Sequence, residues 1–388
     1  MTLRVSLAHT CDRFSVLAFA PFPPLGVLGM NNPNRREFLV GAGTLAAAFV
    51  AGHPLLSANE VAAVNWPSRT IQLPPEIDER NNKKAPVVTA VRLHRQTQML
   101  ATAGDDHIVR VWGLADGKMI QRLDKHIDWV RTIDYSPDGT LLASAGNDRQ
   151  ILLWNAETGE FKSEFAKLPQ AVTSIRFSHD GKLLAAAGFE QTVRLFDVAT
   201  GKLVKEIAGP CDDHRSVAFS PDDQNLAIAG RSGVVRVSSV SSDAPPSDMP
   251  AHRQRVRAMV FSPDGAYLAS AGEDRLVHIS PLGGAAPFLL PRRPAKVLAI
   301  TFYSPTHLAT AGSDNLIRLW DVETQVETGI LTGHTGSVAA LDCIGNTLVS
   351  AGYDTTIRIW TITDNVARGD GNGGQLGRRP DVIEPLRK

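Results

Sequence analysis

The sequence predicts an all-β fold built from seven copies of one short unit, and two observations carry this prediction. First, a glycine recurs at spacings of 42, 42, 42, 42, 40 and 40 residues, at Gly104, Gly146, Gly188, Gly230, Gly272, Gly312 and Gly352. Eight residues after each glycine come, in turn, Trp112, Trp154, Phe196, Ser238, Ser280, Trp320 and Trp360. Second, turn residues separate short apolar runs, and no long amphipathic helical pattern follows residue 60.

The clearest copy runs from His126 to Trp154. Residues 130–135 alternate in polarity up to a Ser-Pro-Asp-Gly turn, in which proline presets φ and glycine relieves the steric cost of closing. Residues 141–145 and 151–154 read as two further strands around a second tight turn at Gly146. Three strands in about thirty residues cannot bury both of their faces, so each unit needs neighbours.

This repeat resembles the WD40 family, whose repeats of about 40 to 45 residues each supply four strands of a propeller blade. The resemblance implies a seven-bladed β-propeller over residues 64–363, closed by an N-terminal strand. The run from Arg69 to Leu73 is the candidate for that strand, because it would cover the open edge of the last blade. Outer strands are expected at Met119–Leu123, Phe161–Phe165, Leu203–Ile207 and Val326–Leu331.

The resemblance also implies a structural tetrad of His, Ser or Thr, Asp and Trp inside a blade. Two repeats carry all four residues, as His126, Ser144, Asp148 and Trp154 and as His334, Ser350, Asp354 and Trp360. His, Ser and Asp also compose a hydrolase triad, but a triad occurs once per active site and this set repeats. Ser238 and Ser280 replace the tryptophan in repeats four and five, so we expect these two blades to be the loosest.

Composition limits the possible partners. Lys plus Arg equals Asp plus Glu at 40 each, so no overall charge attracts nucleic acid, and none is expected as a partner. The 3 cysteines give neither a disulfide framework nor metal-ligand spacing, and Cys211 and Cys343 are expected to be unpaired. We therefore expect no metal and no cofactor.

Residues 30–63 read as an export signal. Asn34 to Leu39 resemble the twin-arginine motif, an apolar run of about fifteen residues reaches Gly52, and Val61 to Ala63 supply small residues for cleavage. The signal predicts an exported protein of the bacterial periplasm or cell envelope, tied to the membrane only through that signal. The alternative is an uncleaved amphipathic anchor or a chance match to the motif. Residues 1–29 are a non-native or disordered extension if translation starts at Met30, and residues 364–388 form a Gly-rich tail expected to be disordered.

In the WD40 family, partners usually bind the face made by the loops into the first strand and by the second turns. On that face Trp129 is the best single candidate, with packing between blades as its alternative. Basic residues in repeats five and six form a second candidate set, suited to an acidic protein segment or another anionic group. They are Arg253, Arg255, Arg292, Arg293 and Lys296. The alternative is a solvated rim whose charges Asp212, Asp213, Glu273 and Asp274 balance.

These observations favour a non-catalytic protein–protein interaction scaffold, folded as a monomeric ring. The alternative is an exported propeller enzyme or small-ligand binder that uses the central channel. That alternative requires carboxylates or histidines converging at one level of the channel, and the repeat positions of the histidines do not supply them.

Overall fold

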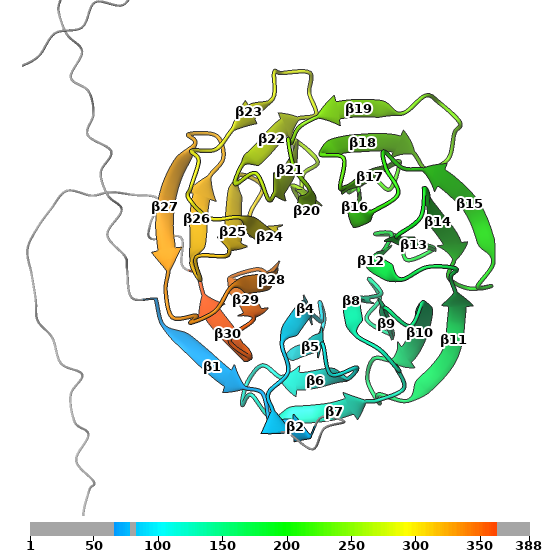
Figure 1. Ribbon diagram of the computed structural model, residues 1–388, viewed down its shortest axis with the longest axis vertical. Helices are drawn as coiled ribbons and strands as arrows, with labels where there is room; N and C mark the ends of the chain where they lie inside the picture. The colour runs from blue at the N-terminus through cyan, green and yellow to red at the C-terminus, as the bar shows by residue number, and fades with distance from the viewer. Residues whose placement is uncertain (1–65, 78–82, 363–388) are drawn as a thin grey trace, which may run out of the picture. The chain divides into compact units, whose positions relative to one another are not determined.

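The computed structural model describes residues 66–77 and 83–362. These residues form seven four-stranded antiparallel sheets, set radially around a central channel as the blades of a β-propeller (Figure 1). The predicted all-β, seven-bladed fold is therefore confirmed. The proposed extension, export signal, Met30 start and Gly-rich tail lie outside the described residues. Within the described ranges, no helix is long and apolar enough to cross a membrane.

Each blade runs outward from the channel through four strands. The inner strands are β4 (Val88–Leu93), β8 (Val130–Tyr135), β12 (Val172–Phe177), β16 (His214–Phe219), β20 (Val256–Phe261), β24 (Val297–Phe302) and β28 (Val338–Ile344). The second strands are β5 (Met99–Gly104), β9 (Leu141–Gly146), β13 (Leu183–Gly188), β17 (Asn225–Gly230), β21 (Tyr267–Gly272), β25 (His307–Gly312) and β29 (Thr347–Gly352).

The third strands are β6 (Val109–Gly113), β10 (Gln150–Asn155), β14 (Thr192–Asp197), β18 (Val234–Ser239), β22 (Val277–Pro281), β26 (Ile317–Asp321) and β30 (Thr356–Thr361). The outer strands are β7 (Met119–Leu123), β11 (Phe161–Lys167), β15 (Leu203–Ala208), β19 (Ser247–Pro250), β23 (Phe288–Leu289), β27 (Val326–Leu331) and, for blade seven, β1 (Ser68–Gln72). A short hairpin of β2 (Glu76–Ile77) and β3 (Lys83–Lys84) precedes blade one.

The recurring glycine marks a close approach of two backbones. In blade two, a Cβ added to Gly146 would lie 1.9 Å from the carbonyl oxygen of Trp129, in the loop that leads into β8. In five further blades a Cβ would meet the equivalent carbonyl oxygen at 1.9 to 2.1 Å, and in blade five at 2.6 Å. Only glycine lets the second turn pack on that loop, which explains why this residue recurs with the period of the repeat.

The N-terminal strand closes the ring as predicted. Strand β1 pairs antiparallel with β30, in a register that sets Ser68 opposite Trp360 and Gln72 opposite Thr356, so blade seven takes strands from both ends of the propeller (Figure 1). At the inner edge of the same joint, the Asp342 carboxylate on β28 accepts a hydrogen bond of 2.7 Å from the Leu93 amide on β4. Blade seven is thereby joined to blade one.

The core is divided into seven apolar clusters, one at each seam between neighbouring blades. Polar bonds between inner strands accompany them. Between blades two and three, Thr132 Oγ1 accepts the Ile175 amide at 3.2 Å, and Asp134 Oδ2 accepts the Phe177 amide at 2.8 Å. Each blade therefore buries its faces only against its neighbours, as a repeat protein requires.

Blades four and five have the least complete outer edges. Their outer strands β19 and β23 have 4 and 2 residues, against 5 to 7 in the other blades. Ser238 and Ser280 stand where four other blades bury tryptophan and blade three buries Phe196. A missing large aromatic side chain typically costs about 3 to 5 kcal/mol where the space is not refilled.

We therefore expect backbone amides of residues 211–285 to exchange with solvent faster than those of other blades, because their local opening costs less free energy. Native-state hydrogen exchange followed by mass spectrometry measures this directly. Blades two and seven, with complete tetrads, are internal controls. Equal protection across all seven blades would contradict the expectation.

Blade four also departs at the start of its inner strand, where His214 replaces the valine of the other six blades. The imidazole is fully buried, at 0% exposure, and fits because Gly209 opposite it has no side chain. Burial lowers the pKa of His214 to about 4, and the nearby carboxylates of Asp213 and Asp212 offset this only in part. The folded state therefore favours the neutral ring.

This shift predicts a pH-dependent stability. Unfolding exposes His214, which then binds a proton near its ordinary pKa of 6.5, so the free energy of unfolding falls as pH drops from about 6.5 towards 4. The loss by pH 4.5 should be about 2 to 3 kcal/mol. Urea unfolding at pH 7 and pH 4.5 should show this component in the wild type and not in His214→Val. An unchanged pH dependence in the variant would refute the assignment.

Candidate functional site

The His, Ser, Asp and Trp side chains of blades two and seven form buried hydrogen-bond chains. In blade two the Trp154 indole donates to Ser144 Oγ at 2.8 Å, and Ser144 Oγ lies 2.7 Å from His126 Nε2. His126 Nδ1 lies 2.6 Å from Asp148 Oδ2. Burial raises the pKa of Asp148, but the hydrogen bond and charge of His126 outweigh it and lower the pKa overall. Blade seven repeats the chain at 2.8, 2.7 and 2.8 Å through Trp360, Ser350, His334 and Asp354.

These chains have the spacing of a hydrolase triad but not its accessibility. Both serines are 0% exposed, and each hydroxyl oxygen accepts a tryptophan N–H. A nucleophilic serine must lie beside a reactive carbon of its substrate. A hydroxyl buried in the middle of a sheet cannot be reached by a substrate. The geometry assigns the tetrads to the stability of their blades.

Three blades that lack the tetrad histidine hold their acidic residue in another way. In blade three, Arg194 binds Glu190 at 2.5 Å and Glu206 on β15 at 2.9 Å. Blades one and six repeat this arrangement, with Arg110 bound to Asp106 and Glu76, and Arg318 bound to Asp314 and Glu327. The tetrad motif alone does not predict these pairs. In the sequence they are marked by a missing tetrad histidine together with an arginine four positions after the acidic residue.

The central channel has a volume of about 760 Å³ and is lined by the inner strands of all seven blades. We call one end of it the mouth face: the side where second strands turn into third strands and loops lead into inner strands. The two features share a side because the first residue of an inner strand pairs with the glycine that ends the second strand, as Val130 does with Gly146. Partners of WD40-like rings were expected on this face.

Aromatic side chains are exposed on the mouth face. Trp129 is 45% exposed, so its ring is not buried between blades. Phe189 and Tyr353, which directly follow the marker glycines of blades three and seven, are 36% and 54% exposed. The sequence motifs singled out Trp129 alone. Phe189 and Tyr353 could have been found in the sequence as aromatic residues directly after the marker glycine. A role for Trp129 in binding stays a prediction.

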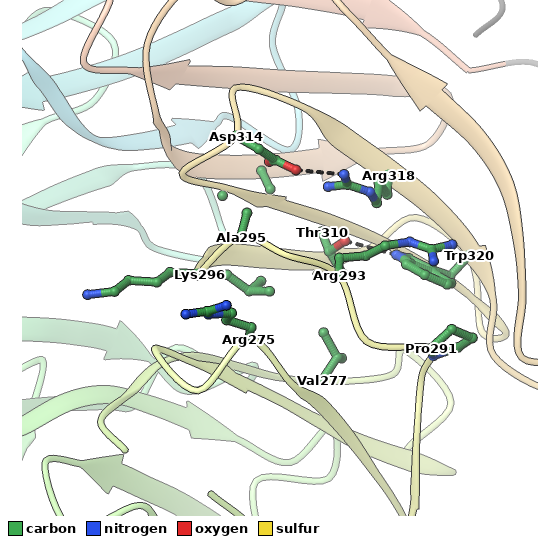
Figure 2. Close-up of a pocket in the computed structure, with 13 residues that line it drawn as sticks. Arg275, Val277, Pro291, Arg293, Ala295, Lys296, Thr310, Asp314, Arg318 and Trp320 are labelled. Atoms are coloured by element: carbon green, nitrogen blue, oxygen red, sulfur yellow. Dashed lines mark hydrogen bonds and ion pairs between the residues drawn. The ribbon is translucent and has the colours of Figure 1, made fainter. Parts of the chain in front are cut away.

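The basic candidates of repeats five and six do not form one patch. Arg293 occupies the position of the tetrad histidine in blade six, where its guanidinium lies 5.2 Å from the Trp320 ring and 2.8 Å from Glu327. Lys296 extends away from Arg293 (Figure 2) and lies 3.7 Å from Glu273. Beside them is a cavity of about 20 Å³, which holds a water molecule at most. The guanidinium of Arg293 therefore contacts side chains of its own blade and not the other basic candidates.

The remaining candidates are placed differently from one another. Arg253 and Arg292 are exposed, and the Arg253 amide donates to Asp274. Arg255 binds both Asp213, at 3.1 Å, and Glu273, at 3.4 Å. Of the four balancing carboxylates that the alternative named, Asp213 and Glu273 therefore lie beside Arg255 or Lys296. Asp212 pairs with Arg231 and Asp274 with His252 instead.

Three arginines that motif reading missed line the channel just inside the mouth face. Arg131, Arg215 and Arg257 are each the second residue of an inner strand, on β8, β16 and β20. The signal was their identical position in three repeats. Sequence alone could not show whether that position faces the channel or a neighbouring blade.

The middle of the channel has a balanced set of charges. Arg92 binds Asp134 at 3.1 Å, and Arg176 and Asp342 lie at the same level of their inner strands. Burial, followed by the charge of Arg92, lowers the pKa of Arg176 to about 10. Burial raises the pKa of Asp342. Two arginines thus face two aspartates, and within the described ranges no group of His, Cys, Asp or Glu could hold a metal ion.

Comparison with protein-family models agrees with this geometry. The model "WD domain, G-beta repeat" matches residues 80–113, 117–155, 201–237, 244–279, 293–321 and 325–361, more than half of the chain. The chain belongs to the WD40 repeat family. Residues 161–213, which contain the third WD40 blade, match the model "Anaphase-promoting complex subunit 4 WD40 domain". No curated protein matches the chain. WD40 propellers commonly serve protein–protein interaction, which directs attention to the mouth face.

Proposed function

We propose that this WD40 propeller is an exported, non-catalytic interaction module whose protein partner docks on the mouth face. The observation that carries the proposal is the set of exposed aromatic rings, Trp129, Phe189 and Tyr353, around a channel mouth lined by arginines. Aromatic residues and arginine are the types enriched at protein interfaces and at their energetic hot spots. Exposed rings on one face of a closed ring favour a partner that covers them.

Enzymatic use of the channel has less support. The repeated His, Ser and Asp sets are buried inside blades, and the charged side chains in the middle of the channel are two arginines and two aspartates that hold inner strands together. A catalytic centre usually combines an accessible nucleophile or acid–base group with a pocket for its substrate. The geometry favours docking over chemistry.

The docking proposal predicts that Trp129→Ala weakens capture of a partner from a bacterial envelope fraction by about tenfold or more, since a hot-spot aromatic contributes at least about 2 kcal/mol. A pull-down with quantified recovery measures this. Ile120→Ala is the matched control, because Ile120 is 54% exposed but lies on outer strand β7 at the rim. Equal recovery with Trp129→Ala and with the wild type would contradict docking at this residue.

Export rests on the motif around Arg35 and Arg36, outside the described residues. A twin-arginine signal is read by a receptor that requires the arginine pair, so Arg35→Lys together with Arg36→Lys should retain the full-length precursor in the cytoplasm of a bacterial host. Cell fractionation with immunodetection measures the distribution. Arg95→Lys, at an exposed position of the propeller, is the control. Export of the double variant at the wild-type level would remove this part of the proposal.

A further inference from the structure

The three channel arginines lie on one arc of the mouth. Strands β8, β12, β16 and β20 are neighbours around the ring (Figure 1), and their second residues are Arg131, Thr173, Arg215 and Arg257. The equivalent residues of the other three blades are uncharged: Thr89, Leu298 and Ala339. A group inside the mouth therefore meets guanidinium groups on one side and uncharged side chains on the other.

The carboxylates near this arc are too few to neutralise it. Asp213 binds Arg215, at 2.6 Å, but it also binds Arg255. Glu273 lies 3.5 Å from Arg257 and is shared with Arg255 and Lys296. Two carboxylates thus serve four cations. Positive charge is left over at the mouth although the whole chain has a net charge of 0.

Arg131 adds to this excess. Its Nε donates to the neutral amide oxygen of Asn147. Burial, followed by the charge of Arg215, lowers the pKa of Arg131, and the nearby Asp128 carboxylate offsets this only in part. Burial also lowers the pKa of Arg257, where Glu273 opposes the effect and Arg215 adds to it. The cations repel one another in a half-buried site, and a bound anion would relieve that repulsion.

We propose that Arg131, Arg215 and Arg257, which we call the arginine arc, bind the carboxylates of an acidic protein segment that inserts into the channel mouth. Guanidinium groups bind carboxylates through paired, charge-assisted hydrogen bonds, which gives both affinity and orientation. Residues flanking the inserted carboxylate would lie over Trp129, Phe189 and Tyr353. The Phe189 ring packs against the arc, since the Arg215 guanidinium lies 4.6 Å from its ring centroid.

The location of the arc favours an inserted side chain over an extended polyanion. The arginines line the interior of the channel, and below them lies the balanced set of Arg92, Asp134, Arg176 and Asp342. An anion that enters from the mouth face therefore meets excess positive charge only at the first level. A nucleic acid would instead need basic side chains along an open surface to follow its phosphates.

This inference rests on the proposed docking function and names the chemistry of the partner. The test uses the full chain and fluorescein-labelled hexaglutamate, with binding measured by fluorescence anisotropy at low ionic strength. The variant is Arg131→Gln with Arg257→Gln. The matched control is Arg95→Gln with Lys182→Gln, which also removes two positive charges; both control residues are exposed in turns at the opposite end of the propeller. Urea unfolding midpoints of all three proteins establish that the substitutions leave the fold intact.

We expect hexaglutamate to bind the wild type, the arc variant to bind about tenfold or more weakly, and the control to stay within about twofold of the wild type. Equal weakening in both variants would show a general charge effect and overturn the proposal. Displacement of hexaglutamate by equimolar inorganic phosphate or single-stranded oligonucleotide would overturn the assignment to a carboxylate segment. If the arc variant binds hexaglutamate normally while Trp129→Ala still loses its partner, this inference fails and the docking function stands.

Discussion

The structure depends on closure of the ring. Every blade leaves two apolar faces that only its neighbours can cover, and the seven seam clusters show that this is how the core is built. Closure is therefore a condition for burying blades one and seven. The β1–β30 pairing closes the ring at its outer edge. The Asp342–Leu93 hydrogen bond joins blade seven to blade one at the inner edge.

Within blades, two different polar networks hold the second and third strands together. Blades two and seven use the full tetrad, a continuous chain of hydrogen bonds that runs from Trp154 or Trp360 through serine and histidine to the aspartate. Blades one, three and six place an arginine between two carboxylates instead. Both solutions pair a buried or half-buried acidic group, which would otherwise destabilise the blade. Among these five blades, the repeats that lack the tetrad histidine have an arginine–carboxylate network in its place.

The channel connects this architecture to function. Its middle level consists of charges that are balanced and tied to inner-strand amides, so it serves the scaffold. Its mouth carries arginines whose counter-charges are shared, together with exposed aromatic rings. Closure forces residues of distant repeats to meet there. The surface that best fits a partner is therefore a product of the ring and not of any single repeat.

The sequence by itself determined the repeat period and the strand positions, because turn glycines and alternating polarity are local signals. Its resemblance to WD40 repeats supplied the tetrads and the closing strand. It also placed Trp129 on the mouth face. Only the tertiary structure decided which side chains share a space. Arg293 stacks on Trp320 because blade six lacks its histidine, and Arg131, Arg215 and Arg257 converge because strands up to 126 residues apart line one channel. Such contacts depend on ring geometry, which no local pattern encodes.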